Sequence, residues 1–532
     1  MPATGYGRRP VALGREGMVA SAHPLATLTG VELLKSGGNA ADAAVAVNAL
    51  LAVTQPHSCG PGGDLFCLYY EAASGRIHFL NGAGRSGARA SLDELRRRNL
   101  PQVPAQGPGS VSVPGCVRGW GMLHERFATR GLAELLAPAI RYAEAGFPLT
   151  SLLSQAIGKR MAEIDDPEWR RIFVPAGQVP RVGDLLVQAD LGRTLRALGA
   201  EGPDLFYRGA VGQAIAGSLE RDGFLTAEDL RDHRGEWGEP ISVSYRGYTV
   251  FEPPPPTQGL AALLALNLLE GFDLAKMRYH SAEHLHLLVE MVKLAYADRD
   301  RWIADPARSR VPVEELLAKS YAAGRRKAFD PRKAQPHEWG DPRGDTTGFV
   351  IVDRHGNLVS VIQSLFAGFG SGVVPEGTGV ILHNRGAYFS TDPSHPNRFE
   401  PGKRPFHTLI AAIVTRAGRP VMGFATRGVD GQALFHVQVL TNVLDFGMDI
   451  QEAIERPRFL WGRFMLGEPR DILRVEGRVS RRALAGLGRR GHRVEAVSGF
   501  YDHMGTAQGV VIKDGTLMGG ADPRGDGIAL GY

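Results

Sequence analysis

The chain has 532 residues, of which 43% are hydrophobic, enough for one large layered assembly or for several domains. Its formal net charge is only +5, and the sequence contains no long block of like charge, which argues against a nucleic-acid-binding arm. The short run Arg96–Arg98 is expected to be a solvated helix face. We therefore expect no nucleic-acid partner.

The cysteines and the apolar stretches favour a cytoplasmic protein. Cys59, Cys67 and Cys116 form no C-x-x-C pair, so a disulfide framework or a structural zinc site is not expected. The N-terminus lacks the apolar region of a secretory signal, and the longest apolar run, "ADAAVAVNALLAV", is too short to span a bilayer. The sequence thus predicts no membrane association, no cofactor and no metal.

The first half of the chain combines helices with glycine-rich turns and strands. The stretch "HPLATLTGVELLKSGGNAADAAVAVNALLAVTQP" predicts two helices; Gly37 and Gly38 close the first, and Asn39 caps the second. Alanine and valine on nearly every face indicate that the second helix is buried. A proline turn at Pro253–Pro256 precedes a further apolar helix, and Ser281 is a plausible cap for a long amphipathic helix that follows.

Residues 322–345 interrupt this order. They are rich in Arg, Lys, Pro, Gly and Asp and lack apolar periodicity, which is typical of an exposed, mobile connection. Beyond them strand-like pairs dominate, with helices expected near 432–444 and 450–455. Strands and helices in both halves predict an α/β fold built as a layered sandwich rather than separate domains.

Two local patterns suggest chemistry that the sequence does not otherwise support, and one familiar hydrolase motif is missing. The glycine loop at 367–372 lacks the Lys-Ser/Thr of a nucleotide site, so a plain tight loop near a site is expected. His280 and His284 have a zinc-like spacing but no third ligand, and a surface role is favoured. No G-x-S-x-G motif is present, which argues against an α/β-hydrolase.

The segment "GDTTGFVIVDRHGNLVSVIQS" predicts a β-hairpin that begins at a candidate nucleophile. A three-residue turn at Arg354–Gly356 places Ser364 opposite Thr346, where Cβ atoms of paired residues are about 4.5–5.5 Å apart. If the chain were cut before Thr346, its free amine could act as the general base for its own hydroxyl. An ordinary strand start is the alternative interpretation.

The segment "FATRGVDGQALFHVQVL" predicts a strand, a glycine turn and a helix. Backbone amides of Gly428 and Val429 would then lie at a helix N-terminus, which suits an oxyanion hole. Replacing Val429 by proline is expected to delete one donor and leave the protein folded. The alternative is a simple turn in which Asp430 caps the helix.

Over nearly its full length the chain resembles the γ-glutamyltransferases, or glutathione hydrolases, which are autoprocessing N-terminal-nucleophile hydrolases. The resemblance rests on "GMVASAHPLATLTGVELLKSGGNAADAAVAVNALLAVTQPHSCGPGGD", "VSVPGCVRGW", "PPPPTQG", "VKLAYADRDRWIADP", "DTTGFVIVDRHGNLVSVIQS", "MDIQEAIERPRF" and "GGADPRGDGIALGY". It implies a four-layer αββα sandwich that cleaves itself between Asp345 and Thr346. A large subunit, 1–345, would stay associated with a small subunit, 346–532, in which Thr346 is the nucleophile. Ser364 takes the place of a threonine that supports the nucleophile, and Gly428 and Val429 match the family's Gly-Gly oxyanion pair.

The resemblance also implies a rebuilt substrate pocket. The family's carboxylate-binding arginine is replaced by Ala83, with Arg85 two residues further on. The family's Asn at a further substrate-binding position is Phe366 here, and its Gln and Asp are Arg385 and Tyr388. Its Ser-Ser pair is His407–Thr408. This pattern is similar to the divergent branch that includes an oxamate amidohydrolase and cephalosporin acylases.

Three functions remain open from the sequence. The first is an autoprocessed amidase for a small amide that carries a carboxylate, which Arg385 would bind through a bidentate contact. The second is true γ-glutamyl transfer or glutathione hydrolysis, with Arg85 replacing the missing arginine. The third is a non-catalytic relative that never cleaves. The sequence leaves the oligomeric state open.

Overall fold

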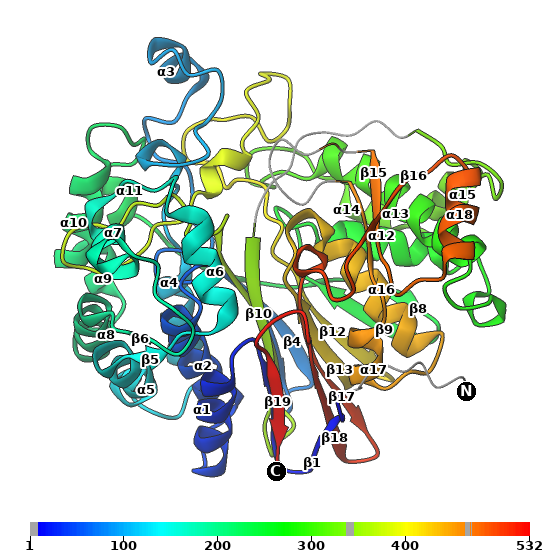
Figure 1. Ribbon diagram of the computed structural model, residues 1–532, viewed down its shortest axis with the longest axis horizontal. Helices are drawn as coiled ribbons and strands as arrows, with labels where there is room; N and C mark the ends of the chain where they lie inside the picture. The colour runs from blue at the N-terminus through cyan, green and yellow to red at the C-terminus, as the bar shows by residue number, and fades with distance from the viewer. Residues whose placement is uncertain (1–8, 337–344, 463–468, 470) are drawn as a thin grey trace.

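The computed structural model describes residues 9–336, 345–462, 469 and 471–532, and for Asp345 and Thr346 it describes the backbone alone. Two seven-stranded antiparallel sheets pack face to face, and helices cover both outer faces (Figure 1). This is the four-layer αββα sandwich that the sequence predicted. No described helix is both long and apolar enough to cross a membrane.

The first sheet has the order β19-β2-β10-β11-β3-β4-β7. Strands β10 and β11 lie at its centre, β10 beside β2 and β11 beside β3. The bounds are β2 (Met18–Ser21), β3 (Asp64–Glu71), β4 (Arg76–Asn81), β7 (Glu236–Gly238), β10 (Asp345–Val352), β11 (Leu358–Phe366) and β19 (Ile528–Gly531).

The second sheet has the order β1-β18-β17-β13-β12-β9-β8. Its inner face packs on the first sheet through small and branched side chains such as Ala411, Ile413 and Val510, all fully buried. The bounds are β1 (Ala12–Gly14), β8 (Ile241–Tyr245), β9 (Tyr248–Glu252), β12 (Ala411–Arg416), β13 (Arg419–Thr426), β17 (Ala507–Lys513) and β18 (Thr516–Ala521).

The helices form two separate outer layers, seen at the left and right of Figure 1. The layer on the first sheet is built on α1 (Pro24–Lys35), α2 (Ala40–Thr54), α4 (Cys116–Phe127), α5 (Leu132–Ala145) and α8 (Ala189–Glu201). The layer on the second sheet contains α12 (Gly259–Leu269), α13 (Ala282–Trp302), α16 (Gln432–Leu444) and α17 (Ile450–Glu455). Helix α18 (Arg481–Arg489) packs on α13.

Local sequence signals account for several of these elements. Asn39 caps α2 as predicted, and Asp42 completes a reciprocal capping box with it. Every residue of α2 is buried, as expected for a helix that carries alanine and valine on nearly every face. Ser281 caps α13 as predicted, and the three cysteines are buried.

The predicted mobile connection differs from the structure in its first half. Helix α15 (Lys319–Arg326) extends into it, and Ala322 is buried. Further along, the Ala334 amide donates to the Arg490 carbonyl oxygen at 2.7 Å, and the His286 ring bonds the Asp330 carbonyl oxygen at 2.8 Å. Long-range contacts thus hold a segment whose composition suggested mobility, whereas 337–344 lie outside the described residues.

The predicted surface role of His284 is wrong. Its side chain is buried and packs edge-on against Phe446, with ring centroids 5.2 Å apart. Burial lowers the pKa of His284 to about 4, so the ring is neutral near neutral pH. Its neighbour His280 is only half-buried.

Candidate functional site

The candidate nucleophile lies at the start of the central hairpin. Strands β10 and β11 pair in the predicted register, with Thr347 opposite Gln363. The register shifts between Asp345 and Thr347, so Thr346 occupies an irregular position at the end of the ladder. The Thr346 side chain lies outside the described residues, and its proximity to Ser364 stays a prediction.

The backbone on both sides of this position is held by buried hydroxyl groups. The Ser364 hydroxyl accepts a hydrogen bond from the Phe366 amide at 2.7 Å, and Ser364 pairs with Asp64 of β3. The Thr347 hydroxyl donates to Gln55 Oε1 at 2.8 Å. The strand end that carries Thr346 is therefore fixed by groups from β11 and from the end of α2.

The predicted oxyanion turn joins β13 to the short helical turn Val429–Gly431, which precedes α16. Gly428 and Val429 both have positive φ, +137° and +58°. A Cβ on Gly428 would lie 2.4 Å from a ring carbon of Phe435, so only glycine fits there. No described residue accepts a hydrogen bond from either amide, as expected for the first donors of a helix. The turn can therefore offer two backbone donors to an anion.

Four of the predicted substrate-binding residues lie together. The Arg385 guanidinium packs over the ring of Phe366, 4.4 Å from its centroid, and 5.6 Å from that of Tyr388. Its Nη1 donates to the Thr408 hydroxyl at 3.3 Å. Because Phe366 is the backbone partner of Asp345, this cationic cluster lies beside the candidate nucleophile.

One edge of Arg385 lacks partners. The side chain is fully buried, yet no described residue accepts a hydrogen bond from its Nε or Nη2. Burial lowers the pKa of Arg385 to about 10, against the opposing effect of Asp64, so it stays cationic at neutral pH. Buried unpaired donors are costly, and Nε with Nη2 is an edge that suits a bidentate carboxylate.

The fifth predicted residue, His407, meets a buried carboxyl group that the sequence prediction missed. Its Nε2 lies 3.5 Å from Asp64 Oδ2, and the same oxygen is 3.3 Å from His383 Nδ1. Burial lowers the pKa of both imidazoles and raises the pKa of the Asp64 carboxyl. Two neutral histidines thus contact Asp64, the first residue of β3, which pairs with Ser364 of the hairpin.

Arg85 is not brought into this cluster. Its Nη1 donates to Asp305 Oδ2 at 3.0 Å, and its Nη2 lies 3.4 Å from Glu236 Oε1. The side chain is one-third exposed, whereas Ala83, at the position of the family arginine, is fully buried. The charge of Arg85 is compensated by these two carboxylates, and its guanidinium forms no hydrogen bond or ion pair with the other predicted pocket residues that the structure describes.

Asp430, considered at first only as a helix cap, belongs to the site. Its Oδ1 accepts a hydrogen bond from the Tyr388 hydroxyl at 2.8 Å and lies 3.7 Å from Arg299 Nη1. Gln258 links this carboxylate to the oxyanion turn, because it accepts from Arg299 at 2.9 Å and donates to the Val429 carbonyl oxygen at 2.8 Å. The position of Asp430 directly after the turn was the only available signal in the sequence.

Among the described residues, one buried group has the geometry of a metal site: His286, Glu290 and His492. Its candidate ligand atoms already have protein partners. His286 Nδ1 is 2.8 Å from His492 Nε2, and Glu290 accepts from Lys293 Nζ at 2.7 Å and from the Gln335 amide at 3.1 Å. The adjacent lysine supplies the positive charge that a metal would otherwise bring, so this cluster is explained without an ion.

A central hairpin whose first strand begins at Asp345 and Thr346, in an αββα sandwich with a left-handed turn before α16, is the arrangement expected of an N-terminal-nucleophile hydrolase. The gamma-glutamyltranspeptidase family model matches residues 26–532. The chain belongs to the gamma-glutamyltranspeptidase family. As a member it is an enzyme of the N-terminal-nucleophile hydrolase class.

Similar proteins place the chain among proenzymes and acylases of this family. It is 40% identical to the glutathione hydrolase-like YwrD proenzyme of Bacillus subtilis, covering 98% of this chain and 99% of that protein. It is 36% identical to the oxamate amidohydrolase proenzyme of Klebsiella pneumoniae, covering 97% and 98%. The crystal structure of cephalosporin acylase from Bacillus halodurans superposes with a TM-score of 0.93 at 37% identity, covering 100% and 99%.

Proposed function

We propose that this enzyme cleaves its own chain between Asp345 and Thr346. The Thr346 hydroxyl adds to the Asp345 carbonyl carbon, the peptide C–N bond breaks, and water hydrolyses the resulting ester. The products are a large subunit, 1–345, and a small subunit, 346–532. The start of β10 at this point supports the cut, and so do the proenzyme names of two relatives.

In turnover the new Thr346 amine, with an ordinary pKa of about 7.7–8.0, accepts the proton of its own hydroxyl. The hydroxyl oxygen then attacks the amide carbonyl of the substrate, and the tetrahedral oxyanion is stabilised by the Gly428 and Val429 amides. The amine of the substrate leaves with a proton, and water releases the acid from the acyl-enzyme. Ser364 supports the nucleophile from the neighbouring strand.

We propose that the substrate is a small amide that carries a carboxylate. The observation that carries this proposal is the buried Nε–Nη2 edge of Arg385, which no described residue fills. A carboxylate would satisfy both donors at once and remove the cost of leaving them unpaired. The relative named oxamate amidohydrolase acts on a compound of this class, which supports the proposal.

A γ-glutamyl compound is a second candidate because of Asp430. An α-ammonium group needs an anion, and from the sequence alone that anion is missing, since Tyr388 takes its place. Asp430 Oδ1 lies behind the Tyr388 hydroxyl and supplies a carboxylate there. We favour the simple amide because Arg299 and Tyr388 already contact this carboxylate, whereas the Arg385 edge has no such partner.

The first test compares kcat/KM for oxamate, glutathione and a γ-glutamyl anilide, using the wild-type enzyme and Arg385→Gln. Loss of two charge-assisted hydrogen bonds is expected to lower kcat/KM for oxamate on the order of 100-fold. Arg385→Lys keeps the charge but not the bidentate edge and is expected to recover only part of the loss. Circular dichroism checks that both variants fold.

Asp430→Asn separates the two candidates. It is expected to leave kcat/KM for oxamate within about threefold of the wild type while further weakening turnover of the γ-glutamyl compounds. γ-Glutamyl compounds that are the best substrates by a wide margin, with no effect of Arg385→Gln, would contradict the small-amide proposal. Glutathione hydrolysis would then be the activity of this enzyme.

A further inference from the structure

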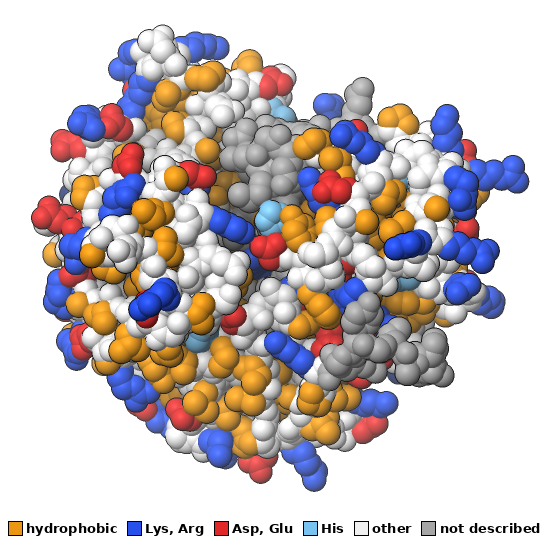
Figure 2. Space-filling model, viewed as in Figure 1, with side chains coloured by type: hydrophobic (Ala, Val, Ile, Leu, Met, Phe, Trp, Pro, Cys, Tyr) orange, Lys and Arg blue, Asp and Glu red, His pale blue; other side chains and the backbone are white. Residues whose placement is uncertain are grey.

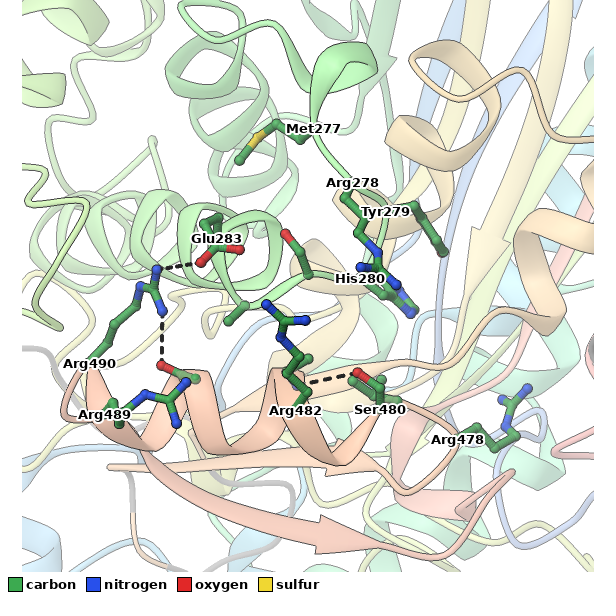
Figure 3. A pocket seen from close by; sticks show the side chains of 15 residues that line it. Met277, Arg278, Tyr279, His280, Glu283, Arg478, Ser480, Arg482, Arg489 and Arg490 are labelled. Carbon is green, nitrogen blue, oxygen red and sulfur yellow. Dashed lines mark hydrogen bonds and ion pairs between the residues drawn. The ribbon is translucent and has the colours of Figure 1, made fainter. Parts of the chain in front are cut away.

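An arginine-rich pocket lies away from the candidate active site, between the start of α13 and helix α18. It encloses about 560 Å³, the size of a small-molecule site. Figure 3 shows it open between the loop Met277–Ser281 and the face of α18 that carries Arg482 and Arg489. We call it the α13–α18 pocket.

The α13–α18 pocket has a large excess of positive charge. Five arginines line it, against a single glutamate, Glu283. Figure 2 shows Lys and Arg side chains gathered on the edge of the molecule where α15 and α18 lie. The five are Arg278, Arg478, Arg482, Arg489 and Arg490.

Two of these arginines are held by the protein, and three are not. Arg490 pairs with Glu283 at 2.7 Å, and Arg478 donates to the Glu455 carbonyl oxygen at 2.7 Å. No described residue forms a hydrogen bond or an ion pair with the guanidinium groups of the other three: Arg278, Arg482 and Arg489. Their charges are therefore available to a ligand.

Two helix N-termini at the pocket add to its positive electrostatic potential. Helix α13 starts after its cap Ser281, and α18 starts after its cap Ser480, and both caps line the pocket. The positive ends of two helix dipoles thus meet guanidinium groups from three segments of the chain. Tyr279 and His280, stacked with centroids 4.0 Å apart, form one wall.

We propose that the α13–α18 pocket binds a small molecule that carries two or more phosphate groups. Convergent guanidinium groups and helix N-termini are the usual partners of phosphate oxygens. A single phosphate would neutralise only part of the charge, whereas a chain of phosphates could reach Arg278 and Arg482 on opposite walls. The limited volume of the pocket, about 560 Å³, favours a small molecule over nucleic acid, which is normally bound along an extended basic stripe.

The two walls come from opposite sides of Thr346 in the sequence, so the ligand would join the two proposed subunits. Binding is therefore expected to raise the thermal midpoint of the enzyme. The site contains none of the residues assigned to catalysis, so turnover of substrate is expected to be unchanged by mutations in it.

The test uses titration calorimetry and thermal unfolding of the purified protein with tripolyphosphate, pyrophosphate, ADP and inorganic phosphate, at an ionic strength of about 0.15 M. Tripolyphosphate is expected to bind with one-to-one stoichiometry. Inorganic phosphate is expected to bind at least about tenfold more weakly. ADP binding tighter than pyrophosphate would show that the stacked Tyr279–His280 rings contribute, and equal binding would show that the phosphates suffice.

Arg482→Glu is paired with Arg481→Glu, which makes the same charge change one residue away, on the same helix but outside the pocket. Arg482→Glu is expected to weaken tripolyphosphate binding at least about tenfold, and Arg481→Glu no more than about twofold. Equal losses in the two variants would overturn the site in favour of diffuse charge. The site would also be overturned if the wild type did not bind tripolyphosphate at millimolar concentration. The same holds if inorganic phosphate bound as tightly as tripolyphosphate.

Discussion

At the scale of single residues, the site depends on backbone conformations that side chains usually avoid. Phe366 and Val429 have φ values of +80° and +58°; Phe366 pairs with Asp345 in the hairpin, and Val429 lies in the predicted oxyanion turn. Such conformations cost about 1–3 kcal/mol each and persist only where surrounding contacts impose them. Gln258, bonded to the Val429 carbonyl oxygen, and the Ser364 hydroxyl, bonded to the Phe366 amide, are those contacts.

Val429→Gly is expected to retain activity, because glycine adopts this φ without strain, while loss of the buried Val429 side chain offsets that relief in the free energy of unfolding. Val429→Pro, by contrast, is not the clean donor deletion that the sequence suggested. Proline fixes φ near −65°, and the turn has +58°. The proline variant is expected to distort the turn and lose both activity and stability. Urea unfolding and kcat measurements check both substitutions, and a stable, active proline variant would contradict the left-handed turn.

At the scale of elements, helix α2 connects the core to the hairpin. Its C-terminal neighbour Gln55 accepts from the Thr347 hydroxyl at 2.8 Å and donates to the Ala22 carbonyl oxygen at 2.9 Å. At the other end, buried Asp42 accepts from the Asn39 and Thr129 amides, at 2.8 Å and 2.9 Å. The helix is therefore fixed at both ends, and its position determines where β10 begins.

Asn39→Ala and Asp42→Ala provide a matched comparison at this helix. Losing the Asn39 cap is expected to lower the free energy of unfolding by about 1 kcal/mol. Asp42→Ala also removes the acceptor of the Thr129 and Arg130 amides and of the Thr129 hydroxyl, and is expected to cost about 2–3 kcal/mol, more than the loss of the cap. Denaturant unfolding measures both, and equal losses would show that Asp42 acts only through the capping box.

At the scale of the whole molecule, both sheets combine strands from the two sides of the proposed cut. In the first sheet β10 lies between β2 and β11, and in the second β12 lies between β9 and β13. Neither proposed subunit could complete a sheet alone. The two subunits are therefore expected to stay associated after cleavage.

Buried neutral histidines should make the whole molecule sensitive to acid. Burial lowers the pKa of His23 and His284 to about 4 and that of His57 and His233 to about 3. In the unfolded chain these groups bind a proton below about pH 6.5, while the folded protein keeps them neutral. Stability is therefore complete above about pH 6.5 and falls as the pH drops towards 3–4. Urea midpoints between about pH 8 and pH 5 test this, and a midpoint that does not fall would contradict it.

Features that depend on local sequence patterns could be predicted from the sequence, whereas features that depend on long-range contacts could not. The bounds of α16 and α17 and the register of the hairpin agree with the structure, since periodicity and turn chemistry determine them. Asp430 and Asp64 were missed as site residues, because their partners come from distant segments. The ion pairs of Arg85 and the buried position of His284 also depend on contacts that the local sequence does not encode.

The most direct test of self-cleavage before Thr346 is mass measurement and N-terminal sequencing of the purified protein after denaturing electrophoresis. Two fragments are expected, and the smaller one should begin Thr-Thr-Gly. Thr346→Ala should leave a single inactive chain of 57.3 kDa. A wild-type protein that remains at the full mass, or a small fragment with any other first residue, would contradict the assignment of Thr346 as the nucleophile.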